Sequence, residues 1–141
     1  MSHSYTFDYP SGSAMQPEVI RFFQDFYQLS DTPDGDDLYP TRFTEDATFI
    51  LASRVSRGRA EILETRKGMW ATVSARRHTV HKVFPFGKDS NEFMLHGVVN
   101  YTFKTGGQGT ADWAGKAVLE EQDGVWRFKF YQVYLDTGSQ K

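Results

Sequence analysis

The order of hydrophobic and polar positions divides the chain into a helical first part and a second part made of strands. From Pro17 to about residue 30, apolar side chains return every three or four positions. They are Val19, Phe22, Phe23, Phe26 and Tyr27. This spacing predicts an amphipathic helix with one thick aromatic face, and Pro17 suits its first turn, where a missing N–H costs nothing.

A second helix is predicted after Gly58. One side of residues 59–75 carries the apolar set Ile62, Met69, Trp70 and Val73, and a helix with such a side buries it. Between the two helices, residues 30–37 predict an acidic turn, residues 38–43 a short helical or irregular piece, and residues 47–53 a strand.

After Ala75 the period of the apolar positions changes from 3.6 to about two. The turn sequences KDSN, TGGQG and EQDG then separate four strands, at about 76–85, 92–104, 109–121 and 125–136. Helices followed by an antiparallel meander of strands predict an α+β fold.

The chain of 141 residues has the size of a single domain. We expect a flexible N-terminal arm over residues 1–14, one domain over residues 15–137 and a C-terminal tail over residues 138–141. Aromatic residues make up 16% of the chain, which predicts a roomy core or a cavity lined by rings.

Charge and composition exclude several classes of function. A net charge of −2 gives no basic surface, so neither nucleic acid nor an anionic membrane is expected as a partner. The sequence has no cysteine, which excludes disulfides and thiolate chemistry. No apolar run has the length of a membrane span and the first residues lack the apolar core of a signal peptide, so we expect a cytoplasmic protein.

Two histidines, His78 and His81, lie three positions apart in the stretch RRHTVHKVFPFG. Successive side chains of a strand point to opposite faces, so these two rings are not expected to bind one metal ion. His96 on the next strand adds no ligand spacing typical of a metal site. We therefore expect no metal and no cofactor, and we expect His81 and His96 to be structural or exposed.

Three features resemble the nuclear-transport-factor-2-like superfamily: FTEDATFI before a strand, a helix that starts with glycine after it, and DGVWRFKFYQVYLD as the last strand. Over about residues 16–137 the chain is similar to the SnoaL-like branch, which includes ketosteroid isomerase, scytalone dehydratase and polyketide cyclases. GMW, DWAGKA and FYQVYLD also resemble small fungal proteins of this branch. The resemblance implies a cone-shaped roll, in which a curved antiparallel sheet packs on two to three N-terminal helices around an apolar pocket.

The resemblance matches one catalytic residue and leaves others without a counterpart. The base of ketosteroid isomerase falls at Leu51 and its aspartic acid donor near Lys116, so steroid isomerisation is not expected. The first catalytic histidine of scytalone dehydratase opens the strand after the second helix, as His78 does. The dehydratase's second histidine has no counterpart here. The corresponding stretch, GTADWAGK, carries Thr110, Asp112 and Lys116 on one alternating face instead.

One face of the strand at 109–121 is a candidate for the pocket wall. When alternate strand positions are counted from the DG turn at residues 123–124, one face is assigned to the cavity. On this face lie Asp112, Lys116, Lys129 and Tyr131. Asp112 and Lys116 would pair there, and Lys116 or a tyrosine would stabilise an oxyanion beside His78. The alternative is that this face is solvated, which the more apolar opposite face around Trp113 favours.

Rings and arginines complete the set of candidates. Tyr27, Tyr101 and Tyr131 can each donate a hydrogen bond to a ligand oxygen or pack in the core, and Tyr27 or Tyr39 could match the dehydratase tyrosines. Trp70 and Trp113 are expected in the pocket wall or in the core. The middle of the sequence carries six arginines, here called the basic middle: Arg54, Arg57, Arg59, Arg66, Arg76 and Arg77. We expect them to form either a solvated surface, an anion-selecting pocket mouth or a dimer contact.

Two functions are therefore expected from the sequence, and whether the protein is an enzyme stays open. The first is a cofactor-independent isomerase, cyclase or dehydratase that acts on a small apolar oxygenated metabolite such as a polyketide or terpenoid. Its catalytic residues would be His78, Asp112 and Lys116. Its substrate-binding residues would be Tyr27, Trp70, Tyr101, Lys129 and Tyr131. The second is a non-catalytic ligand-binding or structural module, whose sheet face would form a homodimer.

Overall fold

The structure is a computed structural model that describes residues 3–12 and 15–140. Its elements, in chain order, are the helix α1 (Pro17–Ser30), the short 3-10 helix η1 (Tyr39–Arg42), the strands β1 (Phe43–Leu51) and β2 (Arg54–Arg57), the helix α2 (Gly58–Met69), the strands β3 (Val73–Pro85), β4 (Glu92–Phe103), β5 (Gln108–Gln122) and β6 (Val125–Leu135), and the 3-10 helix η2 (Thr137–Gln140). The prediction of an α+β fold is confirmed.

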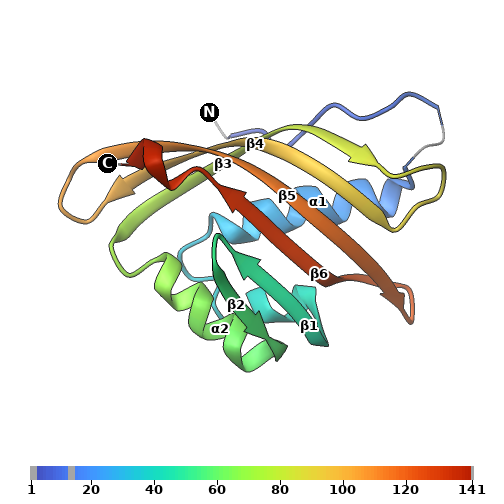
Figure 1. The fold of residues 1–141 in the computed structure, drawn as a ribbon, viewed down its shortest axis with the longest axis horizontal. Coiled ribbons are helices and arrows are strands. Elements are labelled where there is room, and N and C mark those ends of the chain that lie inside the picture. The colour runs from blue at the N-terminus through green and yellow to red at the C-terminus, as the bar shows by residue number, and fades with distance from the viewer. Residues whose placement is uncertain (1–2, 13–14, 141) are drawn as a thin grey trace.

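The six strands form one curved, open sheet in the order β2-β1-β6-β5-β4-β3 (Figure 1). The last four strands pair as the predicted antiparallel meander. β1 joins the other side of the meander by running parallel to β6. β3 is consequently an edge strand, which matters below because it carries His78.

The aromatic face predicted for α1 packs against the inner side of this sheet (Figure 1). Phe26 lies 4.7 Å from the Phe128 ring, and Phe23 lies 5.4 Å from the Phe93 ring, both edge to face. Edge-to-face pairs at such distances stabilise a core beyond the burial of their area. Much of the aromatic excess of the sequence is therefore core packing.

Two elements differ from the prediction around α2. The four-residue strand β2 follows a tight hairpin at Ala52, whose φ of 54° is left-handed. Its residues are mostly polar and exposed, so no apolar alternation marks it. α2 ends at Met69, and Val73 already belongs to β3, since the stretch after Gly68 favours an extended chain over a helix.

Register shifts in two strands change which side chains face the core. The pairing of β3 with β4 shifts between Val80 and Lys82, so Val83 is buried and Phe84, which strict alternation from His78 would place on the inner face, is half exposed. At the β5 to β6 pairing a second shift leaves Phe128 fully buried, although strict alternation from Tyr134 would place it on the exposed face.

The N-terminal arm is docked along the edge strand β3. Asp8 forms a parallel bridge with Lys82, with its N–H donating to the His81 carbonyl at 3.1 Å. Phe7, which belongs to the arm, is buried. The flexibility predicted for residues 1–14 stays a prediction, and residues 1–2, 13–14 and 141 of the predicted arm and tail lie outside the described residues.

No helix within residues 3–12 and 15–140 combines the length and the apolar character needed to cross a bilayer.

Candidate functional site

A histidine and an aspartate from distant parts of the chain meet on the inner side of the sheet. Asp31 caps the C-terminal end of α1, and His78 projects from β3. His78 Nδ1 lies 2.6 Å from Asp31 Oδ1, and the His78 backbone N–H donates to Oδ2 at 2.7 Å. A carboxylate only accepts hydrogen bonds, so a neutral His78 ring carries its proton on Nδ1 and its lone pair on Nε2.

Arg66 fixes the backbone on both sides of Asp31. Its side chain is fully buried on α2 and donates from Nη1 to the Ser30 carbonyl at 2.7 Å and from Nη2 to the Thr32 carbonyl. Its Nε donates to Asp36 at 3.0 Å, which neutralises the buried charge. The acidic turn is therefore held against α2 in one conformation, with the Asp31 carboxylate directed at β3.

The docked arm adds two contacts to the His78–Asp31 pair. The Tyr5 hydroxyl donates to Asp31 Oδ2 at 2.7 Å, and the His3 ring nitrogen Nε2 lies 2.6 Å from the His78 carbonyl oxygen. Burial, followed by the hydrogen bond to Asp31, raises the pKa of Tyr5. The Asp31 carboxylate thus accepts three hydrogen bonds, which hold it in a single orientation.

Two tyrosines lie next to the pair. The Tyr27 and Tyr131 hydroxyls are 2.8 Å apart, and the Tyr27 ring lies 5.3 Å from both the His78 ring and the Trp113 ring. Burial raises the pKa of Tyr27 and of Tyr131, so both stay protonated at neutral pH. When Tyr27 donates in this hydrogen bond, the proton of Tyr131 remains for a ligand oxygen.

His78 lines a cavity between α1 and the sheet, here called the inner cavity. Its volume is about 60 Å³, and the empty space between its walls, including the part open to solvent, is about 480 Å³. Of the predicted catalytic and substrate-binding residues, His78, Tyr101 and Tyr131 line it, and so do the further candidates Tyr39 and Arg76. Tyr27 and Trp70 pack behind its lining rather than in it.

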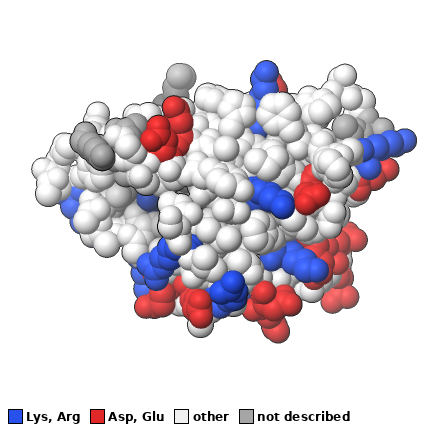
Figure 2. All heavy atoms as spheres, viewed as in Figure 1, with Lys and Arg blue, Asp and Glu red and all other residues white. Residues whose placement is uncertain are grey.

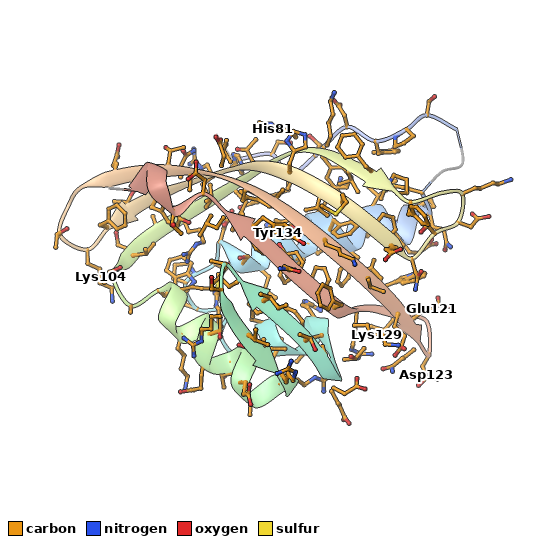
Figure 3. All side chains as sticks on the ribbon, in the orientation of Figure 1. His81, Lys104, Glu121, Asp123, Lys129 and Tyr134 are labelled. Carbon is orange, nitrogen blue, oxygen red and sulfur yellow. The ribbon has the colours of Figure 1, made fainter. Side chains whose placement is uncertain are left out.

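On β5 the strand face counted toward the cavity is the wrong one, and on β6 the count is right for Tyr131 but wrong for Lys129. Asp112, Lys116 and Lys129 lie on the outer side of the sheet, where Figure 3 shows Lys129 on β6. Lys116 pairs with Glu92 at 3.9 Å instead of with Asp112. The reason is apolar burial: Trp113 and Ala117 of β5 occupy the inner side, and alternation then sends their neighbours outward.

His81 and His96 lie away from the site. His81 is exposed on the outer side of β3, at the upper edge in Figure 3, and its ring is 5.6 Å from the His96 ring. His78 and His81 therefore do point to opposite faces. In the part of the chain that the structure describes, no group of three or more acidic or histidine side chains could hold a metal ion.

Sequence reasoning found His78 but missed Asp31 and Tyr5, and it named Arg66 in the basic middle without its contact to the acidic turn. Asp31 lies in a turn and Tyr5 in the arm, where no period of apolar residues indicates a direction for the side chain. The one available signal was the density of acidic residues in the stretch SDTPDGDD at the end of the first helix.

No family model and no curated protein matches the sequence. Solved structures do match the fold. A candidate scytalone dehydratase from Novosphingobium aromaticivorans superposes with a TM-score of 0.75 at 15% identity, over 84% of this chain and 82% of that chain. ActVI-ORFA from Streptomyces coelicolor gives a TM-score of 0.68 at 22% identity, over 84% of this chain and 95% of that chain.

A third match is nuclear transport factor 2 from Cryptosporidium parvum, with a TM-score of 0.66 at 14% identity, over 82% of this chain and 90% of that chain. These likenesses show that the chain has the fold of the nuclear-transport-factor-2-like superfamily. At such identities they do not assign an activity. The resemblance to small fungal proteins stays a prediction.

Proposed function

We propose that this protein is a cofactor-independent enzyme that moves a proton on a small, mostly apolar oxygenated molecule by general acid–base catalysis. The observation that carries the proposal is the His78–Asp31 pair, held at 2.6 Å in the wall of the inner cavity. A positioned imidazole oriented by a carboxylate is a common base in proton-transfer enzymes.

In the proposed reaction, Nε2 of neutral His78 takes a proton from a carbon next to a carbonyl of the substrate. The electron pair of the broken C–H bond moves toward the carbonyl oxygen and forms an enolate. Asp31 stabilises the imidazolium cation that results. Tyr131, which lines the cavity, would donate a hydrogen bond to the developing oxyanion.

The fate of the proton separates two reaction types. In an isomerisation, the imidazolium returns the proton to another carbon of the substrate. In a dehydration, the electron pair forms a C=C bond, the C–O bond breaks, and the imidazolium protonates the leaving hydroxide to water. The candidate scytalone dehydratase among the similar structures supports dehydration as one of the two reaction types. ActVI-ORFA supports the resemblance to the SnoaL-like branch.

A second candidate function is a non-catalytic binding module, and the size of the inner cavity favours it. A volume of about 60 Å³ holds only a few water-sized groups. Rings such as Phe26 and Tyr131 fill much of the space between α1 and the sheet. In this alternative the cavity would store part of a ligand without reacting with it.

Hydrogen exchange at carbon distinguishes the two candidates. The full chain is incubated in D₂O with a panel of cyclic β-hydroxyketones, and NMR follows deuterium incorporation next to the carbonyl and formation of the enone. We expect exchange with the wild type and a loss of about a hundredfold or more in His78→Gln. The matched control is His81→Gln, which changes an exposed histidine of the same strand and should leave the rate unchanged.

A folded His78→Gln protein that exchanges as fast as the wild type would contradict the proposed mechanism. Saturable ligand binding without any exchange across the panel would favour the binding module.

A further inference from the structure

Arg76 lies where the inner cavity joins a second hollow. This second hollow, here called the outer hollow, has a volume of about 310 Å³ and extends toward α2. The residues that line both spaces are Leu51, Met69, Arg76, Tyr101 and Leu135. Arg76 is the charged member of this set, so its side chain borders both spaces.

The guanidinium of Arg76 is mostly buried between two aromatic faces. Its central carbon lies 5.2 Å from the Trp70 ring and 5.2 Å from the Tyr101 ring. Its Nη1 is buried and has no hydrogen-bond partner among the described residues, and the same holds for the indole nitrogens of Trp70 and Trp113. All three atoms are donors, and a buried donor without an acceptor costs free energy.

The hollows around Arg76 carry positive charge only. The inner cavity, the outer hollow and a third depression along β3 and β4 are lined by Arg54, Arg76 and Arg77, and by no aspartate or glutamate. The chain as a whole has a net charge of −2. On the face shown in Figure 2, acidic and basic side chains are mixed. The basic lining therefore does not reflect the overall composition.

Nearby acidic groups are already engaged. Asp31 accepts hydrogen bonds from His78 and Tyr5, and Asp36 pairs with Arg66 at 3.0 Å. Burial lowers the pKa of Arg76, and the interactions with Tyr101, Tyr39 and Asp31 offset this only in part. A partly buried cation without an ion-pair partner would gain stability from an anion supplied by a ligand.

We propose that the pocket binds a carboxylate ligand, whose oxygens accept hydrogen bonds from Arg76 between the inner cavity and the outer hollow. A guanidinium binds a planar carboxylate through two parallel hydrogen bonds, which explains arginine at this position better than lysine. The inference rests on the proposed function and specifies its substrate as a carboxylic acid. Arg76 and His78 are two residues apart on one face of β3, about 7 Å along the strand, so the carboxylate and the reacting carbon are separated by a few bonds.

The test uses benzoate and benzamide, which have nearly the same shape and differ in charge. Binding to the full chain is measured by isothermal titration calorimetry. We expect benzoate to bind the wild type at least about tenfold more tightly than benzamide, and we expect Arg76→Met to remove this preference. Arg57→Met is the matched control, because it removes an exposed arginine that lines none of these hollows, and it should keep the preference.

Equal binding of benzoate and benzamide to the wild type, or no binding of either, would overturn the inference. This comparison needs no variant, so it decides the question even if Arg76→Met fails to fold. A folded Arg76→Met protein that keeps the benzoate preference would also overturn it.

The carboxylate site and the proposed reaction fail separately. His78→Gln should lose proton exchange and keep the preference for benzoate. A wild type that prefers benzoate but catalyses no exchange would contradict the proposed function alone. Exchange without a preference for benzoate would contradict the carboxylate site alone.

Discussion

At the scale of single residues, the site depends on a contact between positions 47 apart in the sequence, Asp31 and His78. The carboxylate accepts from both the ring and the backbone of His78, so it fixes the tautomer and the orientation of the ring together. Arg66 and Tyr5 act through Asp31 and are positioning residues. The candidate base is thus held by partners from α1, α2 and the arm.

Replacing Asp31 tests whether this arrangement contributes to turnover. Asp31→Asn keeps the size of the side chain but removes the charge that stabilises the imidazolium, so we expect the exchange rate to fall by about a hundredfold. The measurement is the deuterium assay at neutral pH. Asp34→Asn, an exposed acid of the same turn, is the control and should keep the wild-type rate. An unchanged rate in folded Asp31→Asn would remove the carboxylate from the mechanism.

Four buried or half-buried tyrosine side chains predict how the free energy of unfolding changes at alkaline pH. The pKa is raised by burial for Tyr5, Tyr27, Tyr39 and Tyr131. The neutral phenol is favoured in the folded state, so this stability is complete below the ordinary tyrosine pKa of about 10 and is lost as the pH rises above it.

We expect tyrosinate absorbance from Tyr27, Tyr39 and Tyr131, three of the seven tyrosines, to develop only with the loss of the circular dichroism signal. Titration of all seven tyrosines with the folded signal intact would contradict the buried assignments.

At the scale of elements, the apolar period was sufficient to predict α1, α2 and the four-stranded meander. It did not predict which side chains face the cavity, because shifts in pairing change the alternation. The shift between Val80 and Lys82 turns Phe84 outward, and the shift opposite Val118 and Leu119 turns Phe128 inward. The apolar period also does not indicate where side chains point in turns and in the arm, and these segments supply Asp31 and Tyr5.

The contact between β3 and β4 depends on a glycine. A Cβ at Gly97 would lie 1.9 Å from the Thr79 carbonyl oxygen, which is backbone and has little freedom to move. We expect Gly97→Ala to lower the free energy of unfolding by about 1–3 kcal/mol or more in urea denaturation.

Gly107→Ala is the control for this variant, since its Cβ would come no closer than 4.0 Å to Phe103. Its effect should stay within about 0.5 kcal/mol. Equal stability of the two variants would contradict the close approach of the strands.

At the scale of the whole molecule, the outer side of the sheet predicts a homodimer. The large apolar residues exposed there include Phe84 at 50%, Met94 at 42% and Tyr134 at 48%, the last labelled on β6 in Figure 3. Exposed apolar patches commonly mark contacts between proteins. We expect a dimer mass by light scattering at micromolar concentration and a monomer for Met94→Lys.

Val125→Lys is the control for the dimer, because it removes an apolar residue at the start of β6, next to the β5–β6 turn. It should stay dimeric. A monomeric wild type would contradict the predicted dimer.

The docked arm has a consequence for solubility. β3 ends the sheet, and an uncovered edge strand offers its backbone to strands of other molecules. Asp8 occupies part of that edge by bonding to the backbone of His81 and Val83. The segment that orients Asp31 through Tyr5 therefore also shields the edge against intermolecular pairing, so cleavage of the arm would cause aggregation and loss of the site together.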